Sequence, residues 1–365
     1  SEARTDDRGR PRVPLAGPLA ALAGFVLVLV AALALREVAS LLVPVLFGLF
    51  IALVAWPLVG KLERRGARRS LALAVAMLTI LVIVLAAVAI IAISIGELVI
   101  QVPKYESRMR DQIAAFRDLL AQFGIATDVG AITAIISPEM LTSLIRPIGS
   151  AVSGAGVGLF VLAFTMIYAL FGAAGLHARA AAAFGEGHHL LVGAERFGTD
   201  LRRYLLVRAQ LGLFAAVFVL VLLIVLGVPL PGLWAFLVFA ASFIPNVGTF
   251  IAVIPPTILA FLEGGVGTAV AVVVGYTLIN FAQDHFLQPV IMGNELNLSP
   301  LVVFLSVLVW AWILGAGGAL LAVPLTVGLV MIMEAFPAAR GIAALLRNKV
   351  EPPAGSAEAA PFAGA

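Results

Sequence analysis

Long apolar runs alternate with short basic loops over most of the chain. Apolar residues fill 15–35, 38–59 and 71–95, and each run has about the 20 residues needed to cross the hydrocarbon core of a bilayer. The runs lack the alternating ten-residue pattern of membrane β-strands, which indicates helices. Hydrophobic residues make up 62% of the 365 positions and charged residues 12%, a composition that a soluble domain of this size cannot bury. The sequence therefore predicts an all-α, polytopic membrane protein with about six to eight spans.

The position of the basic residues predicts how the first spans are oriented. The loop 61–69, KLERRGARR, carries one lysine and four arginines. Because Lys and Arg near span ends stay on the cytoplasmic side, this loop predicts a cytoplasmic amino terminus, an outward-facing turn at Arg36-Glu37 and a third span that runs outward. The first run is longer than the core of a signal peptide, about 7–15 residues, so we interpret it as an uncleaved span. Residues 1–96 are thus expected to hold the N-terminal spans and this loop.

A different pattern follows at 97–147, where charges separate the apolar positions. Apolar side chains recur there at three- and four-residue steps, notably at Val102, Met109, Ile113, Phe116 and Leu120. Such a stripe predicts an external amphipathic helix with one packed face. Two interpretations stay open: the face covers the membrane domain of its own subunit, or it forms a contact between subunits, because the spacing is close to a heptad.

The region 148–340 is predicted to form the core of the protein. A fourth span at 148–175 leads to a basic stretch at 177–208, which we expect to be a cytoplasmic loop. Beyond it the chain is almost free of charge until a Pro-, Ala- and Gly-rich tail at 341–365, which predicts a disordered cytoplasmic end.

Two apolar stretches in this core are interrupted by helix-breaking residues. The first, 234–262, is divided at Pro245-Asn246-Val247-Gly248, and the second, 301–336, is divided by a glycine cluster. The residues expected to interrupt the two hairpins, besides those at 245–248, are Pro255 and Pro256 in the first and Gly315, Gly318 and Pro324 in the second. Each arm is shorter than a full crossing, so each pair forms a broken helix or a re-entrant hairpin. Paired interruptions of this kind point to a transporter binding site.

Polar residues gather at the end of the span that follows the first break. Tyr276, Asn280 and Asp284 share one helical face, with Gln283 beside it. Polar groups placed this way either form hydrogen bonds within the bundle or line a hydrophilic path. Asp284 lies about eighteen residues after the span begins, which favours the water interface. The candidate pathway consists of Pro245, Asn246, Gly248, Tyr276, Asn280, Gln283, Asp284, Gln288 and Pro289.

Several classes of function lack their sequence signature. The chain contains no cysteine, which excludes disulfides and thiolate metal sites. It has no Gly-x-x-x-x-Gly-Lys-Ser/Thr phosphate loop, no His-Glu-x-x-His motif and no converging Ser, His and Asp set. We therefore predict neither an enzyme nor an ATP-driven pump, and we expect no cofactor and no metal. The basic loops are explained by topology, so no nucleic-acid binding is predicted.

A series of short motifs in the carboxy-terminal half occurs in a specific order. They are LLIVLGVP at 222–229, SFIPNVGTFIAVIPP at 242–256, NFAQDHFLQPVIMG at 280–293, LNLSPLVVFLSVL at 296–308 and GAGGALLAVPL at 315–325. In this order they resemble the AI-2E family of bacterial membrane transporters. The resemblance implies a multi-pass secondary transporter of the bacterial inner (plasma) membrane, and the basic segments predict that both termini are cytoplasmic. It also implies a homo-oligomer such as a pentamer.

Three functions stay open at this point. The resemblance implies export of a small polar solute such as autoinducer-2 by alternating access. It also leaves open a sodium(cation)/proton antiporter, with H⁺ or Na⁺ as the coupling ion. An alternative of another class is a non-transporting oligomeric scaffold or a channel-like assembly, held together through the helix at 102–123.

Overall fold

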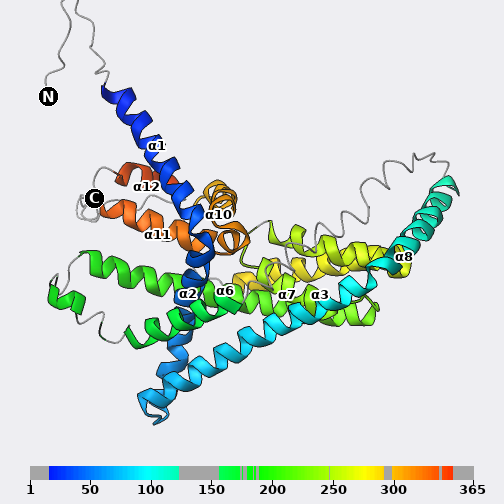
Figure 1. Ribbon diagram of the computed structural model, residues 1–365, viewed down its shortest axis with the longest axis horizontal. Coiled ribbons are helices and arrows are strands. Elements are labelled where there is room, and N and C mark those ends of the chain that lie inside the picture. Colours follow the sequence, from blue (N-terminus) through cyan, green and yellow to red (C-terminus); the bar gives the residue numbers. More distant parts are fainter. Residues whose placement is uncertain are drawn as a thin grey trace, which may run out of the picture.

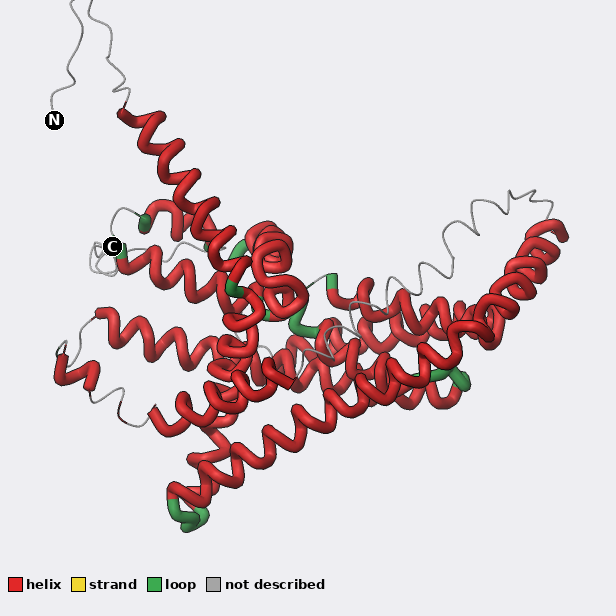
Figure 2. The backbone as a smooth tube through the Cα atoms, in the orientation of Figure 1, coloured by secondary structure: helices red, strands yellow, loops and turns green. Residues whose placement is uncertain are grey.

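The computed structural model describes residues 16–122, 156–172, 175, 179–183, 185, 189–245, 247–291, 298–336 and 339–347. Within these ranges every regular element is a helix (Figure 2), and an isolated β-bridge joins Leu298 to Arg347. Five of these helices are long and apolar enough to cross a membrane, and three shorter apolar helices accompany them. The prediction of an all-α polytopic membrane protein is confirmed.

Helices α1 (Ala16–Glu37) and α2 (Ala39–Arg64) follow one another across a bend. Figure 1 shows them end to end, not side by side. The amide of Leu42 donates to the carbonyl of Val38 at 2.9 Å, so helical hydrogen bonding resumes at once after the junction. The predicted reversal at Arg36-Glu37 is therefore wrong. A charged pair lowers the local hydropathy without ending a helix, because Arg and Glu are both good helix formers.

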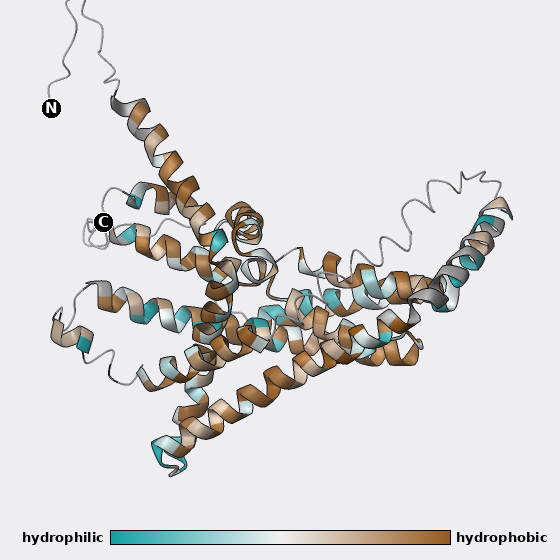
Figure 3. Cartoon of the chain, in the orientation of Figure 1, coloured by the Kyte–Doolittle hydropathy of each residue, from teal (hydrophilic) through white to brown (hydrophobic). Residues whose placement is uncertain are grey.

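Helix α3 (Arg69–Gln122) joins the predicted third span and the predicted external helix into one element of 54 residues. At 1.5 Å per residue its length is about 80 Å. Figure 3 shows that its first half is mainly apolar and that polar residues appear toward its far end. Near its start Ala72, Leu73 and Ala76 are buried, in a cluster that also contains Met166 from the helix Gly156–Gly172.

The far part of α3 contacts its own chain. Phe116 meets Phe261 edge to face with ring centroids 6.3 Å apart, and Arg108 forms an ion pair with Glu263. These contacts agree with the interpretation that this helix covers its own subunit. The side chains of the other predicted contact residues lie outside the described ones, so the subunit contact stays a prediction; these residues are Val102, Met109, Ile113 and Leu120.

The centre of the molecule consists of α6 (His189–Val225), α7 (Pro231–Ala241) and α8 (Gly248–Ala282). They share a buried apolar cluster in which Leu223 of α6 and Val272 of α8 have no exposed surface. Figure 1 shows α6, α7 and α8 lying along one another. The chain leaves α7 at Ala241 and turns over 242–247 before α8 begins, so the predicted first interruption is present.

The two arms of α8, 248–264 and 266–282, form the first hairpin, and the prediction that Pro255 and Pro256 break it is wrong. Both lie inside α8, and the chain reverses nine residues later at Gly265, where φ is 75° and ψ is −166°. Proline holds φ near its helical value and removes an amide donor, so it can weaken or bend a helix without reversing it. The reversal needs a backbone conformation that is essentially restricted to glycine.

A second hairpin lies within α10 (Pro300–Leu320) and α11 (Ala322–Ala335): its first arm is 300–314, and its second arm consists of the end of α10 and α11. The chain reverses at Gly315, where φ is 67° and ψ is −153°, as the glycine cluster predicts. Gly318 and Pro324 have other roles. An added Cβ at Gly318 would lie 2.0 Å from the carbonyl oxygen of Trp310, and Pro324 occupies the first turn of α11, where its missing amide is not needed.

The carboxy-terminal region is ordered further than predicted. Helix α12 (Arg340–Leu346) packs with Ala343 fully buried against Leu298 and Val330. The amide of Ser299 donates to the carbonyl of Leu346 at 3.2 Å. The prediction that disorder begins at residue 341 is therefore wrong for α12. The apolar stripe of this short helix is enough for it to pack on the second hairpin. Residues 348–365 lie outside the described part of the chain.

Candidate functional site

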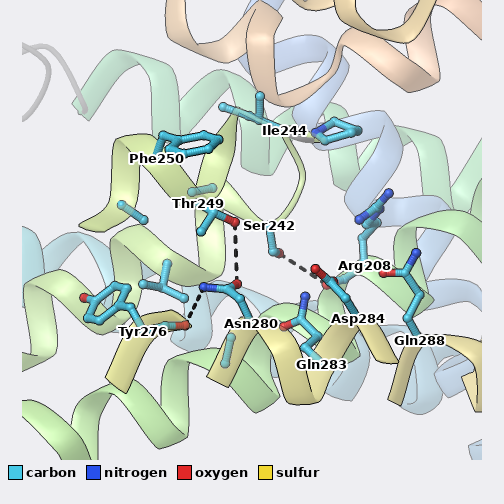
Figure 4. A pocket seen from close by; sticks show the side chains of 15 residues that line it. Arg208, Ser242, Ile244, Thr249, Phe250, Tyr276, Asn280, Gln283, Asp284 and Gln288 are labelled. Carbon is cyan, nitrogen blue, oxygen red and sulfur yellow. Dashed lines mark hydrogen bonds between the residues drawn. The ribbon is translucent and has the colours of Figure 1, made fainter. Parts of the chain in front are cut away.

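A cavity of about 520 Å³ lies where α6, the turn after α7 and both arms of α8 meet. Figure 4 shows the side chains that line it. The predicted pathway residues among them are Pro245, Tyr276, Asn280, Gln283, Asp284 and Gln288. The structure thus brings the first break and the polar helix end together, as the candidate pathway requires.

The two arms of α8 are bridged at the cavity by a pair of polar side chains. Thr249 at the start of the first arm donates from Oγ1 to Oδ1 of Asn280 in the second arm, at 3.5 Å (Figure 4). The amide nitrogen of Asn280 donates to the carbonyl of Tyr276 at 2.8 Å. The bridge between the arms is at the long end of the hydrogen-bond range and is therefore weak.

A π-helical turn, η1 (Gln283–Leu287), separates α8 from α9 (Gln288–Ile291). Such turns widen the helix locally, shift the register of the side chains that follow, and occur frequently at functional sites. Here the residues on both sides of the turn, Gln283, Asp284 and Gln288, all line the cavity. Gln283 is 8% exposed, and its Oε1 has no hydrogen-bond partner, whereas Asp284 is exposed.

Sequence reasoning missed three polar residues of the lining, Arg208, Ser242 and Thr249. Arg208 was placed in a basic loop at 177–208, but α6 begins at His189, so the second part of that stretch is helical. Tyr204 and Arg208 are four residues apart on a helix whose Leu201 and Leu205 are buried. That 3.6-residue pattern is the signal that could have placed Arg208 on a helix.

Not every predicted site residue reaches the cavity. Asn246 lies outside the described residues. Gly248 is buried next to the carbonyl of Ala241 and is absent from the lining, and Pro289 is exposed on α9. The lining also contains no residue of the second hairpin, so Gly315, Gly318 and Pro324 shape a separate part of the fold.

The lining offers both hydrogen-bond donors and acceptors and little net charge. It contains one arginine and one carboxylate, together with hydroxyl and amide side chains, and apolar residues such as Ile244 and Phe250 complete it. In the part of the chain that the structure describes, no group of three or more His, Cys, Asp or Glu side chains could hold a metal ion. This chemistry suits a small polar solute of low net charge.

Comparison with known proteins identifies the family of the chain. Residues 19–338 match the family model described as AI-2E family transporter. The chain is 29% identical to "AI-2 transport protein TqsA" of Escherichia coli K12 over 314 residues, which cover 86% of this chain and 91% of that protein. It is 28% identical to "Putative transport protein YhhT" of the same organism, covering 80% and 84%, and 29% identical to a "Putative transport protein" of Haemophilus influenzae, covering 89% and 95%. The chain therefore belongs to the AI-2E transporter family.

Proposed function

We propose that this protein is a secondary transporter of the bacterial inner membrane that exports a small polar solute, such as autoinducer-2 or a related molecule. Family membership supports membrane transport, and the name of the E. coli relative, an AI-2 transport protein, supports this class of cargo. The observation that carries the proposal is the cavity at the base of the first hairpin, whose polar lining comes from α6, both arms of α8 and the π-turn.

In this proposal the first hairpin is the part that moves during alternating access. Its two arms meet at Gly265 and are joined at the cavity by the weak bond between Thr249 and Asn280. A solute hydroxyl can replace either partner of that bond at little cost, because one hydrogen bond is exchanged for another. Binding of the solute and separation of the two arms are then coupled through the Thr249–Asn280 hydrogen bond.

Removing the polar groups of the cavity is expected to reduce export. In proteoliposomes loaded with autoinducer-2, Asn280→Ala and Gln283→Ala should each lower the efflux rate about tenfold, because each leaves a solute group unpaired at a cost of about 1–3 kcal/mol. Thr277→Ala is the matched control, because Thr277 lies on the same helix and is exposed. Efflux at the wild-type rate in both cavity variants would rule out the proposed site.

Proton-coupled cation exchange is a second candidate, because a carboxylate, Asp284, lines the same cavity. We expect Asp284→Asn to lower solute efflux less than threefold or so, since Asp284 is exposed and water can replace its hydrogen bonds. The measurement is efflux with and without a pH gradient, in parallel with Na⁺-driven proton movement. Wild-type Na⁺/H⁺ exchange that disappears in Asp284→Asn would favour the antiporter instead.

A further inference from the structure

Arg208 introduces a positive charge into a cavity otherwise lined by neutral groups and one carboxylate. The ion pairs found among the described residues, Arg69 with Glu63, Arg108 with Glu263 and Arg347 with Glu334, do not include it. Arg208 is partly buried, and its Nε is fully buried without a hydrogen-bond partner. A guanidinium in such surroundings is unfavourable unless an anion compensates its charge.

The side chain of Arg208 is held in place by its neighbours. Its guanidinium carbon lies 5.5 Å from the centroid of the Tyr204 ring, a cation–π distance. The hydroxyl of Ser242 lies 3.3 Å from the carbonyl oxygen of Arg208 and 2.7 Å from that of Phe239, which ties this turn of α6 to the end of α7. The Tyr204 ring thus orients the guanidinium, and Ser242 fixes the backbone that carries it, an arrangement that favours recognition of a planar or tetrahedral oxyanion.

The other polar groups of the cavity are arranged differently. In Figure 4 Arg208 and Tyr276 lie at opposite ends of the lining, with Asn280 and Thr249 between them. These neutral groups can donate to and accept from hydroxyl groups. Asp284 is near the cationic end and repels any anion there, but it is exposed and forms no ion pair with Arg208, so water and salt screen its charge.

We propose that Arg208 binds an anionic oxygen group of the transported solute, so that the protein prefers a small hydroxylated monoanion over a neutral polyol of the same size. This inference rests on the proposed function, because it assigns the cavity to the cargo. Arg208 is the specificity-determining residue, and the amide and hydroxyl side chains bind the hydroxylated part.

A matched pair of probes tests the preference directly. Gluconate and sorbitol have the same number of carbon atoms and similar hydroxyl groups, but only gluconate carries a carboxylate. Binding of each to the purified full-length protein in detergent is measured by isothermal titration. Wild type should bind gluconate at least about tenfold more tightly than sorbitol at low ionic strength, since hydrogen bonds to a charged group are the stronger ones. The preference should shrink as salt is added.

Variants at position 208 assign the preference to this residue. Arg208→Gln should bring the two affinities within about twofold of each other, with sorbitol binding unchanged. Arg208→Lys keeps the charge but loses the forked geometry, so it should retain a weaker preference. If Arg208→Gln fails to fold, the gluconate preference of Arg208→Lys tests the role of Arg208 in its place. The control is Arg203→Gln, which removes the same charge from an exposed position of α6 and should leave the preference intact.

Several results would overturn the inference. Equal binding of the two probes by wild type, or an unchanged preference in Arg208→Gln or Arg208→Lys, contradicts it. A lipid phosphate has the same oxyanion chemistry, so the titration is repeated in nanodiscs containing phosphatidylglycerol; loss of gluconate binding there assigns Arg208 to lipid and overturns a solute role. Efflux of both probes without preference removes this inference alone, whereas a binding preference in a protein that exports neither the probes nor autoinducer-2 removes the transport proposal alone.

Discussion

Gly248→Ala is expected to destabilise the protein strongly and to abolish efflux. A Cβ at this position would lie 1.9 Å from the carbonyl oxygen of Ala241 and 2.7 Å from its carbonyl carbon. These are backbone atoms, and the amide of Gly248 donates to Ile244 at 3.0 Å, so the turn cannot move aside without losing its own hydrogen bonds. Overpacking of this kind costs about 1–3 kcal/mol or more, and here the distortion lies directly beside Thr249 of the cavity.

The comparison for this variant is Gly267→Ala in the same helix. Nothing lies within 4 Å of a Cβ at Gly267, which is exposed, so alanine should be neutral or slightly stabilising. Thermal unfolding of the purified protein and efflux from proteoliposomes are measured for both variants. A melting temperature of Gly248→Ala equal to that of wild type would show that the turn over 242–247 is not packed as described.

Gly265→Ala should have the second largest effect, and for a different reason. Its φ of 75° and ψ of −166° belong to a region that only glycine adopts readily, so any side chain there costs about 1–3 kcal/mol of backbone strain. Steric contact contributes less, because the nearest atom to an added Cβ is Oε1 of Gln112 at 3.0 Å, the end of a flexible side chain. The strain would be relieved by opening the tip of the first hairpin.

For Gly265→Ala we therefore expect a lower melting temperature and reduced efflux. The Gln112→Ala background separates the two causes: it removes the steric contact and leaves the backbone strain. A Gly265→Ala variant that is restored to wild-type stability by Gln112→Ala would attribute the effect to side-chain crowding and contradict the explanation by backbone conformation.

The features of the fold that depend on local chemistry could be predicted from the sequence. Composition gives the membrane class, and the reversal at Gly315 follows from a glycine cluster between two apolar arms. The break predicted at Pro255 and Pro256 is wrong, because the helix continues through both prolines and the chain reverses at Gly265. Proline restricts φ to a helical value, whereas glycine alone provides a positive φ, and propensity does not show which of them tertiary packing will use.

The sequence predicts the part of the candidate site in which helical periodicity alone determines which side chains share a face. Tyr276, Asn280 and Asp284 are spaced by four residues and do line one cavity. The π-turn at 283–287 has no sequence signal of its own, although it sets the register of Gln288. Arg208 was missed because the positive-inside rule already accounted for a basic stretch there, so its charge seemed to need no further explanation.

The unbroken course of α3 has a mechanical consequence. Arg108, which pairs with the hairpin tip at Glu263, lies on the same helix as Ala72 and Leu73, roughly 55 Å farther along it at 1.5 Å per residue. Pro103 lies between these points and removes a backbone amide donor, so part of a tilt at the buried end is taken up as bending of α3 and the rest moves Arg108. Helix tilt responds to bilayer thickness. A change in the thickness of the surrounding lipid would therefore be transmitted along α3 and would displace the tip of the hairpin whose base forms the cavity.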